Sequence, residues 1–386
     1  MSRELIVTRQ ELVDLHRRAP RNAVLSVYLD QAEPGKAALR RGQSALNAGL
    51  RELERAHPDD RALAAAAEGA RRIYRKLPPE DRRRHLVLFL SLESDWLWWR
   101  SLQLPPGDRM VWMDRPYLRP LVALLDSAPP VGVVVVASGI VRLLTWSQGV
   151  VDEATPRKFV LADEDWRRYA GPAPAHPGMA QQTSTNVEKY EDRVEVHLRR
   201  FLAEVGGEVA EAGERERWRR VVLLGAPALT EALAASLPDP WRSRVLPGPA
   251  LNLARAPAGA VADAVTGVVA GWVRARDREA VRELLDAVAV GGTAATGAQA
   301  CLDLLRENRV SHLYLDDQLR LSGYRRPDGA LIIADGPVPP GAAVERHLVE
   351  RMIEMALDQG AAVTLVGGEA AERLRAAGGV GARLRY

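Results

Sequence analysis

Residues 131–154 read VGVVVVASGIVRLLTWSQGVVDEA and decide the fold of the middle of the chain. Three apolar runs alternate here with two short breaks that contain glycine: Val131–Ala137, Ser138-Gly139, Ile140–Trp146, Ser147-Gln148-Gly149 and Val150–Ala154. Runs rich in β-branched residues, separated by two or three small polar residues, are typical of antiparallel strands joined by tight turns. The stretch therefore predicts a three-stranded antiparallel meander.

Helices and strands alternate after this meander. Val221–Gly225 predicts a buried strand, and Pro227–Leu237 predicts a helix with proline in its first turn. A meander followed by such alternation predicts a ribonuclease-H-like layered sheet. The meander carries Arg142 and no carboxylate before Asp152, so we expect neither a metal site nor a metal-dependent nuclease.

A polar loop, His176–Thr185, lies between the meander and the later strand, and a helix is predicted from Asn186. Thr185 and Glu188 have the spacing of a capping box, which marks the start of that helix. Apolar residues then recur at steps of three and four, as on one face of an α-helix: Val187, Tyr190, Val194, Leu198, Phe201 and Val205.

The loop has two interpretations from its residues alone. It is either an ordinary turn, or a tip that carries the small polar groups of Gly178, Gln181 and Gln182 into a distant crevice. The polar face of the following helix is basic and would suit a phosphate-rich partner, because the arginine fork binds phosphate with two hydrogen bonds: Arg193, Arg199 and Arg200.

The first part of the chain predicts an α/β domain. Leu25–Asp30 alternates as a strand, two helices are expected near 36–56 and 60–76, and Leu86–Leu92 is a second strand. Trp96 and Trp98 share one face of a further strand, where core packing is expected.

The second of those helices ends in a basic run that includes Arg71, Arg72 and Arg75. Two interpretations stay open for this run: a solvated face, or a surface that binds the backbone of RNA.

The last part of the chain predicts helices on both sides of a sheet, in a domain of roughly 100 residues. Gly291–Gly297 is rich in glycine, but no Gly-Lys-Ser/Thr follows, so a P-loop is excluded and the stretch is interpreted as the entry to helix 298–308. Cys301 shares a face with leucines and is expected to be a buried thiol. Asp316 and Asp317 end a strand and are expected to form a turn.

Composition bounds the class of protein. The chain has 386 residues, a net charge of +3 and one cysteine, so we expect two or three domains, no disulfide framework and a cytoplasmic location. No apolar run reaches the length of a membrane span, and no membrane partner is expected. We divide the chain into an N-terminal domain 1–127, a middle domain 128–275 and a C-terminal domain 276–386.

Several of these features occur in one order along nearly the whole chain: Leu25–Asp30, the meander with its loop and long helix, Gly291–Gly297 with a helix, Val310–Asp316, and Gly378–Tyr386. In that order they resemble the bacterial branch of the archaeal and eukaryotic class-1 peptide release factor and Pelota superfamily. The resemblance implies a first domain facing the decoding region, a middle domain reaching the peptidyl-transferase centre, and a last domain with the fold of kink-turn-binding ribosomal proteins.

The resemblance also implies roles for the loop. Releasing members carry Gly-Gly-Gln on a mobile loop before a long helix, and here Gly178, Gln181 and Gln182 occupy that place without the double glycine. A glutamine at such a tip could hold water against the ester carbonyl of peptidyl-tRNA. No Asn-Ile-Lys-Ser motif is present in the first part, so codon-specific termination is not expected.

The function expected from the resemblance is that of a translation factor that binds the A site of stalled or idle ribosomes. Three versions stay open: a rescue factor that hydrolyses peptidyl-tRNA, a non-catalytic hibernation factor, and a protein-binding adaptor without RNA contact. The partners implied are the ribosome, through rRNA and peptidyl-tRNA, and a translational GTPase. No cofactor is expected.

Overall fold

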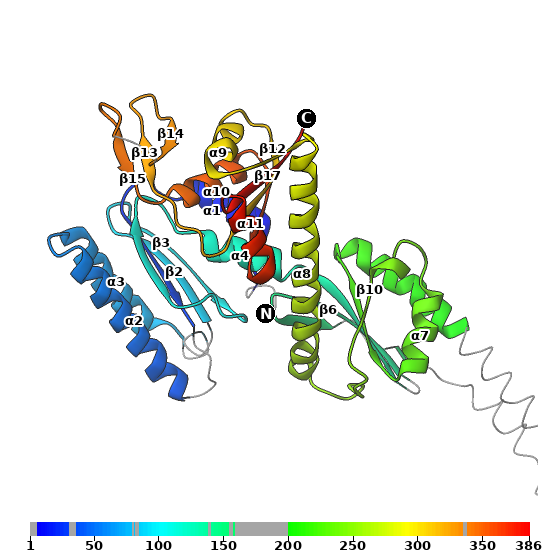
Figure 1. The fold of residues 1–386 in the computed structure, drawn as a ribbon. Coiled ribbons are helices and arrows are strands. Elements are labelled where there is room, and N and C mark those ends of the chain that lie inside the picture. The colour runs from blue at the N-terminus through cyan, green and yellow to red at the C-terminus, as the bar shows by residue number, and fades with distance from the viewer. Residues whose placement is uncertain are drawn as a thin grey trace, which may run out of the picture. The chain divides into compact units, whose positions relative to one another are not determined.

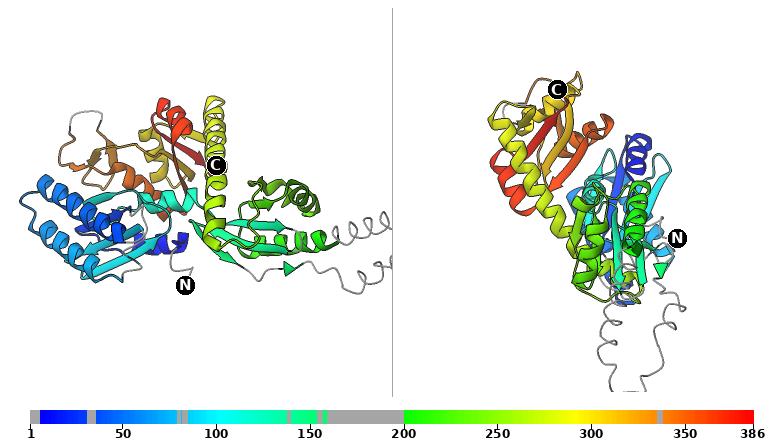
Figure 2. Two further views of the ribbon diagram at one scale, coloured as in Figure 1. Left: turned by 90° about the horizontal axis from the view of Figure 1, so that it is seen from below. Right: turned by 90° about the vertical axis from the view of Figure 1, so that its right-hand side faces the viewer.

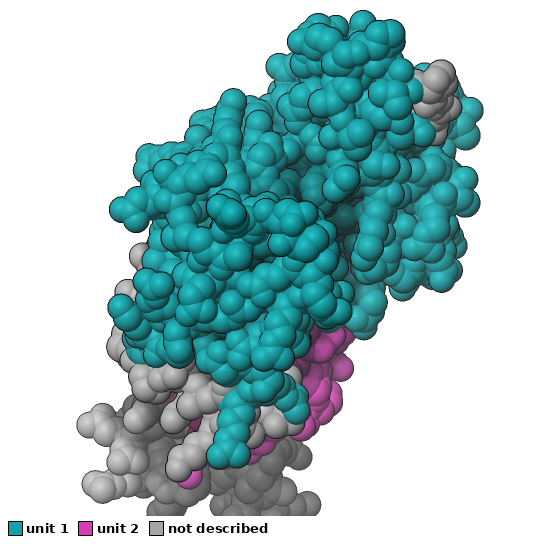
Figure 3. All heavy atoms as spheres, turned by 90° about the vertical axis from the view of Figure 1, so that its left-hand side faces the viewer, with its two compact units in different colours: residues 1–128, 270–386 teal, residues 129–269 magenta. Residues whose placement is uncertain are grey.

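The computed structural model describes residues 6–30, 36–78, 81, 85–137, 140–153, 157–158, 200–334 and 338–386 (Figure 1). The chain is a mixed α/β protein with several sheets. It divides into two compact units, coloured separately in Figure 3: unit 1 combines residues 1–128 with 270–386, and unit 2 is 129–269. The boundary after Ala128 coincides with Pro129-Pro130. The division into three domains stays a prediction.

The first sheet of unit 1 is antiparallel, with the order β3-β2-β1-β4. Its strands are β1 (Val24–Leu29), β2 (His85–Ser91), β3 (Trp96–Leu102) and β4 (Arg109–Met113). The helices α2 (Lys36–Ala56) and α3 (Arg61–Lys76) cover one face, where Leu46, Leu50 and Leu63 pack against Leu25 and Val27. The predicted helices and strands of this part are therefore confirmed.

The second sheet of unit 1 has the order β11-β17-β12-β16, and β12 and β16 run parallel. Its strands are β11 (Ala294–Thr296), β12 (Val310–Asp316), β16 (Ala362–Val366) and β17 (Val380–Leu384). The helices α9 (Ala298–Arg306) and α10 (Leu348–Asp358) pack on one face, and α8 (Ala258–Ala289) and α11 (Gly368–Ala376) on the other. Cys301 is fully buried, as predicted.

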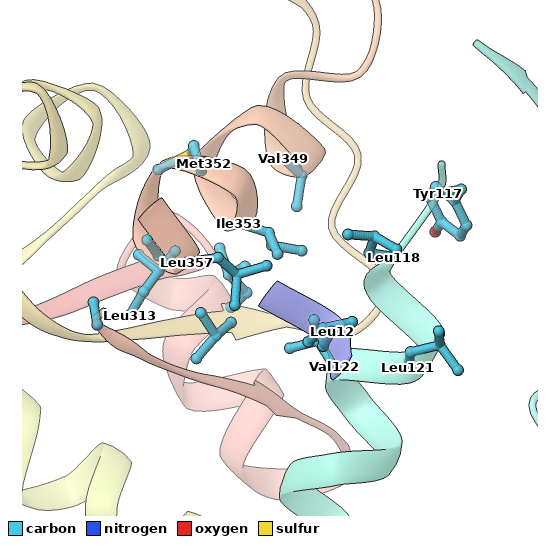
Figure 4. Close-up of a cluster of buried hydrophobic side chains, with 14 of the residues drawn as sticks. Leu12, Tyr117, Leu118, Leu121, Val122, Leu313, Val349, Met352, Ile353 and Leu357 are labelled. Atoms are coloured by element: carbon cyan, nitrogen blue, oxygen red, sulfur yellow. The ribbon is translucent and has the colours of Figure 1, made fainter. Parts of the chain in front are cut away.

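One hydrophobic core joins the two sheets of unit 1 (Figure 4). The helices α1 (Arg9–Arg18) and α4 (Arg119–Ser127) supply apolar residues to this core, which also contains residues of both sheets. In Figure 4, Leu12 and Val122 lie near Ile353 of α10, and Leu313 of β12 lies farther along the same cluster. Residues from the start and the end of the sequence therefore exclude water from the same volume, which makes them one folding unit.

Buried arginines reinforce this junction. The guanidinium of Arg119 is buried and donates to the carbonyl oxygens of Asp316 and Asp317, both at 2.8 Å, and of Leu319 at 2.7 Å. Arg351 of α10, only 5% exposed, donates to three carboxylates: Asp114, Glu345 and Glu354.

A small antiparallel sheet is inserted between β12 and α10 and lies at an outer edge of unit 1 in Figure 1. Its strands are β13 (Gly323–Arg325), β14 (Leu331–Ile333) and β15 (Ala343–Glu345), in the order β14-β13-β15. Arg326–Gly329 forms the turn between β13 and β14, and Gly329 takes a φ of 83°.

Unit 2 is a sheet in the order β10-β9-β5-β6-β7, with β8 pairing the start of β6. Its strands are β5 (Val131–Ala137), β6 (Ile140–Ser147), β7 (Val150–Glu153), β8 (Arg157–Lys158), β9 (Val221–Gly225) and β10 (Val245–Pro247), and its helices are residues 200–215, α7 (Pro227–Ser236) and the short turn η3 (Arg242–Arg244). β5, β6 and β7 are antiparallel neighbours, which confirms the meander. β9 runs parallel to β5.

One stretch differs from the sequence prediction. The sequence predicts the glycine-rich stretch 291–297 only as a helix entry, but it contains β11, which pairs with β17. Elsewhere, α8 begins at Ala258, and Val261, Val265 and Val269 bury one helical face although glycines interrupt the pattern. α10 begins at Leu348, because Val344 is held in β15 by pairing with β13.

Candidate nucleic-acid interface

The predicted catalytic loop lies outside the described residues. Gly178, Gln181, Gln182, Arg193 and Arg199 are all in 159–199, so their roles stay predictions. The structure describes the part of unit 2 from which this segment departs and to which it returns (Figure 2).

Both ends of that segment attach to one end of the unit 2 sheet. β8 pairs with the first residues of β6, Ile140↔Lys158 and Val141↔Arg157. The helix that begins the return, 200–215, buries Leu202 and Val205 in the same cluster as Val141. The attachment points are therefore fixed by strand pairing on one side and by helix packing on the other.

The C-terminal end of the predicted helical stripe is confirmed. Val205 is buried and Phe201 packs against the same cluster, as the steps of three and four require. Arg200 lies on the opposite face, with 80% of its side chain exposed, and lies 3.4 Å from Glu204 one turn later. An exposed pair of this kind contributes little stability, so Arg200 is available to another partner.

The helix is seated on unit 2 by close contacts that need glycine. A Cβ at Gly206 would lie 2.8 Å from the carbonyl oxygen of Ser236, whereas one at the next residue, Gly207, would meet nothing within 4 Å. Ser236 also donates its hydroxyl to the Leu202 carbonyl at 2.9 Å. The helix and α7 therefore approach backbone to backbone.

The basic hairpin formed by α2 and α3 is the second candidate surface. Residues 36–76 contain ten lysines and arginines and five aspartates and glutamates, a net charge of +5, while the whole chain carries only +3. Figure 3 shows unit 1 from the side on which these helices lie in Figure 1. This concentration of positive charge is what a polyanion binds.

The three predicted RNA-binding arginines of α3 differ in their surroundings. Arg71 donates two hydrogen bonds to the Glu54 carboxylate of α2, at 3.0 and 3.2 Å, and is only 20% exposed. Arg75 reaches Glu68 at 3.4 Å with both side chains exposed. Arg72 is exposed and forms no ion pair with a described residue. Arg71 therefore holds α2 and α3 together, and Arg72 is the more available of the three.

Further exposed cations extend the surface beyond those three. Arg51, Arg55 and Arg61 are exposed around the turn between the helices and have no ion pair among the described residues. Arg61 is the first residue of α3, after the cap Asp60, whose carboxylate accepts from Leu63 N–H at 2.9 Å and from the Trp112 indole at 2.8 Å. These hydrogen bonds lower the pKa of Asp60. The N-cap at Asp60 places Arg61 in the first turn of α3, where it is exposed. The basic run at the end of α3 did not point to this residue.

The carboxylates in the described ranges form no metal site. No group of three or more His, Cys, Asp or Glu side chains there is placed to hold a metal ion. Glu153 accepts two hydrogen bonds from Arg142, at 2.6 and 2.7 Å. Asp316 ends β12 and accepts from Gln318 N–H and Arg375, which lower its pKa against the effect of burial. The turn predicted at Asp316 and Asp317 is confirmed.

None of the helices in the described ranges combines the length and the hydropathy of a membrane span.

Comparison with known families gives one match by sequence. Residues 116–268 match the family described as bacterial archaeo-eukaryotic release factor family 10, which is less than half of the chain. The match covers α4, the unit 2 sheet and the segment with Gly178, Gln181 and Gln182. No curated protein matches the chain.

Three similar solved structures each have a TM-score below 0.5. Pelota from Archaeoglobus fulgidus is 13% identical, with 99% of this chain and 93% of that chain covered and a TM-score of 0.36. The archaeal translation termination factor aRF1 is 16% identical, with 100% of each chain covered and a TM-score of 0.24. Pelota in a model of ribosome-bound archaeal Pelota and ABCE1 is 12% identical, with 98% and 94% covered and a TM-score of 0.42.

Proposed function

Because residues 116–268 match a family of bacterial archaeo-eukaryotic release factors, we propose that the chain is a translation factor of the release factor and Pelota superfamily that binds the A site of stalled or idle ribosomes. The observation that carries the proposal is that the family match includes both the Gly178–Gln182 loop and the sheet that anchors it. In this proposal unit 2 directs the loop toward the peptidyl-transferase centre. The ribosome, its rRNA and peptidyl-tRNA are the partners, and the cytoplasm is the location.

The α2–α3 hairpin supplies the RNA contact in this proposal. Its exposed arginines would lie on rRNA phosphates, which release counterions when they are neutralised. Arg51, Arg55 and Arg72 are the residues that we assign to this contact, since no described carboxylate pairs with them. The predicted contacts of Arg193, Arg199 and Arg200 would add to it from the long helix.

The domain descriptions are part of the same proposal. The order β10-β9-β5-β6-β7, with β6 antiparallel to its neighbours, supports a ribonuclease-H-like middle domain. Helices on both faces of the β11-β17-β12-β16 sheet support a last domain of the kink-turn-binding type. A translational GTPase as a further partner rests on the resemblance alone.

Co-sedimentation with ribosomes tests the binding. The chain should pellet with ribosomes, and the logarithm of its affinity should fall linearly with the logarithm of salt concentration. Replacing Arg51, Arg55 and Arg72 with alanine should reduce that salt slope by about three, one for each lost phosphate contact. Arg282→Ala is the matched control, because Arg282 is an exposed cation of unit 1 that already pairs with Glu279 at 2.5 Å. Absence of binding at low salt would refute the proposal.

A second experiment separates rescue from hibernation. Peptidyl-tRNA release on stalled ribosomes is measured with the wild type and with the double variant Gln181→Ala, Gln182→Ala. Loss of release with unchanged ribosome binding identifies a hydrolytic rescue factor. Unchanged release excludes catalysis by this loop, and no release from either protein identifies a factor that only occupies the ribosome.

A further inference from the structure

The small sheet of unit 1 has one face that packs on the core and one that does not. Gly323, Leu331 and Glu345 are buried, and Glu345 meets Arg351 beneath the sheet. Direct cross-strand partners share a face, and the register Ile332↔Tyr324↔Val344 puts these three side chains on the opposite face. None of the three belongs to a hydrophobic cluster among the described residues.

This outer row is apolar and accessible. Val344 is 64% exposed and Val338 is 57% exposed. Beside Ile332 lies an open hollow of about 470 Å³, which prolines and the ends of the turn line: Arg326, Pro327, Asp328, Ile332, Pro339 and Pro340. A hollow lined by three prolines and one isoleucine, next to exposed valines, is a surface that an inserted apolar side chain would cover.

Positive charge borders the apolar row at both ends. Arg326 follows β13, lines the hollow and is 52% exposed, with Asp328 no closer than 3.7 Å. Arg346 follows β15, is exposed and forms no ion pair with a described residue. In the antiparallel register, extended from Arg325↔Ala343 and Gly323↔Glu345, these arginines lie four residues apart along the strands, or roughly 13 Å.

These observations favour a protein segment over a nucleic acid. Bases bind single-strand sites by stacking on exposed aromatic rings, and this face has only the half-buried Tyr324. Its exposed centre is aliphatic and its hollow is lined by prolines, which suits an apolar side chain. The arginine at each end could pair with a carboxylate of the bound segment, one on each side of its apolar side chain.

We propose that the outer face of the β13-β14-β15 sheet is a docking site for an acidic, extended peptide segment of a partner protein. One apolar side chain of the segment enters the hollow beside Ile332. One Asp or Glu on each side pairs with Arg326 and Arg346. An extended peptide advances about 3.3 Å per residue, so the two acidic residues stand about four positions apart with the apolar anchor between them.

Selection from a phage-displayed library of random 12-residue peptides, with the full chain as bait, tests this site. The enriched peptides should share an apolar residue flanked on both sides by Asp or Glu. The absence of such a pattern overturns the proposal. One enriched peptide is then labelled, and its affinity is measured by fluorescence anisotropy.

Variants locate the binding. Val344→Asp should weaken the labelled peptide at least tenfold, while Val290→Asp, at another exposed valine of unit 1 (83%), should leave it unchanged. The double variant Arg326→Glu, Arg346→Glu should lose the acidic peptide and bind the same peptide with lysines in place of its acidic residues. The proposal is overturned if the wild type and Val344→Asp bind the peptide equally well. It is also overturned if the wild type binds labelled oligouridine and the same variants abolish that binding.

Discussion

His312 gives a pH dependence of stability whose size follows from its surroundings. The imidazole lies on β12 and stacks on Tyr314, with ring centroids 4.1 Å apart. Its Nε2 lies 2.9 Å from the Thr364 hydroxyl oxygen of β16, and its Nδ1 lies 3.2 Å from the Tyr314 hydroxyl oxygen. Both ring nitrogens of a neutral imidazole are therefore satisfied, one as donor and one as acceptor.

A proton on the half-buried His312 would lie among positive charges. Burial, followed by the guanidinium groups of Arg276, Arg383 and Arg9, lowers the pKa of His312 to about 4. The nearby carboxylates are already bound by two of these arginines: Asp126 and Asp277 by Arg276, and Glu283 by Arg383. The folded protein therefore keeps His312 neutral at a pH where an unfolded chain binds a proton.

The sign and the size of the effect follow. In the unfolded chain histidine has a pKa of about 6.5, so that state gains a proton first as the pH falls. The stability conferred by a neutral His312 is complete above about pH 6.5 and is lost between about pH 6.5 and pH 4. At about 1.4 kcal/mol for each pH unit between the two pKa values, the loss is about 3 kcal/mol.

Replacement by glutamine removes the titration and keeps an amide donor for Thr364. Hydrogen exchange of 310–316, corrected for the intrinsic pH dependence, gives the free energy of opening between about pH 7.5 and pH 4.5. The difference between wild type and His312→Gln should shrink by about 2.5 kcal/mol across this range, because pH 4.5 lies above the folded-state pKa. Strand β9 in unit 2, Val221–Gly225, contains no histidine and should behave alike in both proteins. Parallel curves for 310–316 would refute the reasoning.

Three other perturbations have expected results. Arg351→Met should cost about 3–5 kcal/mol in urea unfolding, because it leaves three carboxylates without their buried cation. Gly206→Ala should lower the stability of unit 2 by about 1–3 kcal/mol, because its Cβ meets a backbone oxygen. Gly207→Ala should raise it by up to about 1 kcal/mol in the same helix, where a Cβ meets nothing. Arg71→Ala should lower the melting temperature, whereas Arg72→Ala should leave it unchanged and weaken ribosome binding.

Local patterns in the sequence were enough for the elements that carry their own signals. The glycine-containing breaks at Ser138-Gly139 and Ser147-Gln148-Gly149 specify the turns of the meander before any tertiary contact forms. The apolar steps that end at Phe201 and Val205 specify which helix face is buried. Interactions within a few residues are visible in sequence because the backbone period fixes which side chains are neighbours.

Long-range pairing could not be predicted in this way. Arg351 stands among charged residues of an amphipathic helix and would be taken for a surface residue, yet it is buried and donates to Asp114, 237 positions away. Arg71 was predicted to bind RNA, and its neutralisation depends on Glu54, 17 positions earlier in another helix. The candidate loop at Gly178–Gln182 differs from these two arginines, because its role is predicted from sequence and resemblance alone.

The shared core limits how the two proposed surfaces of unit 1 can influence each other. The α2–α3 hairpin and the small sheet are joined through the core that α1 and α4 complete. Exposing even roughly ten of its large apolar side chains would cost about 15–30 kcal/mol, more than the 5–15 kcal/mol that separates most folded domains from the unfolded state. An RNA bound at one surface therefore cannot reshape the other by moving the two sheets apart. The two surfaces can still act together if the peptide partner is attached to the same ribosome. Binding of the chain to the ribosome would then raise the effective concentration of the peptide, by an amount that the tether of the peptide sets.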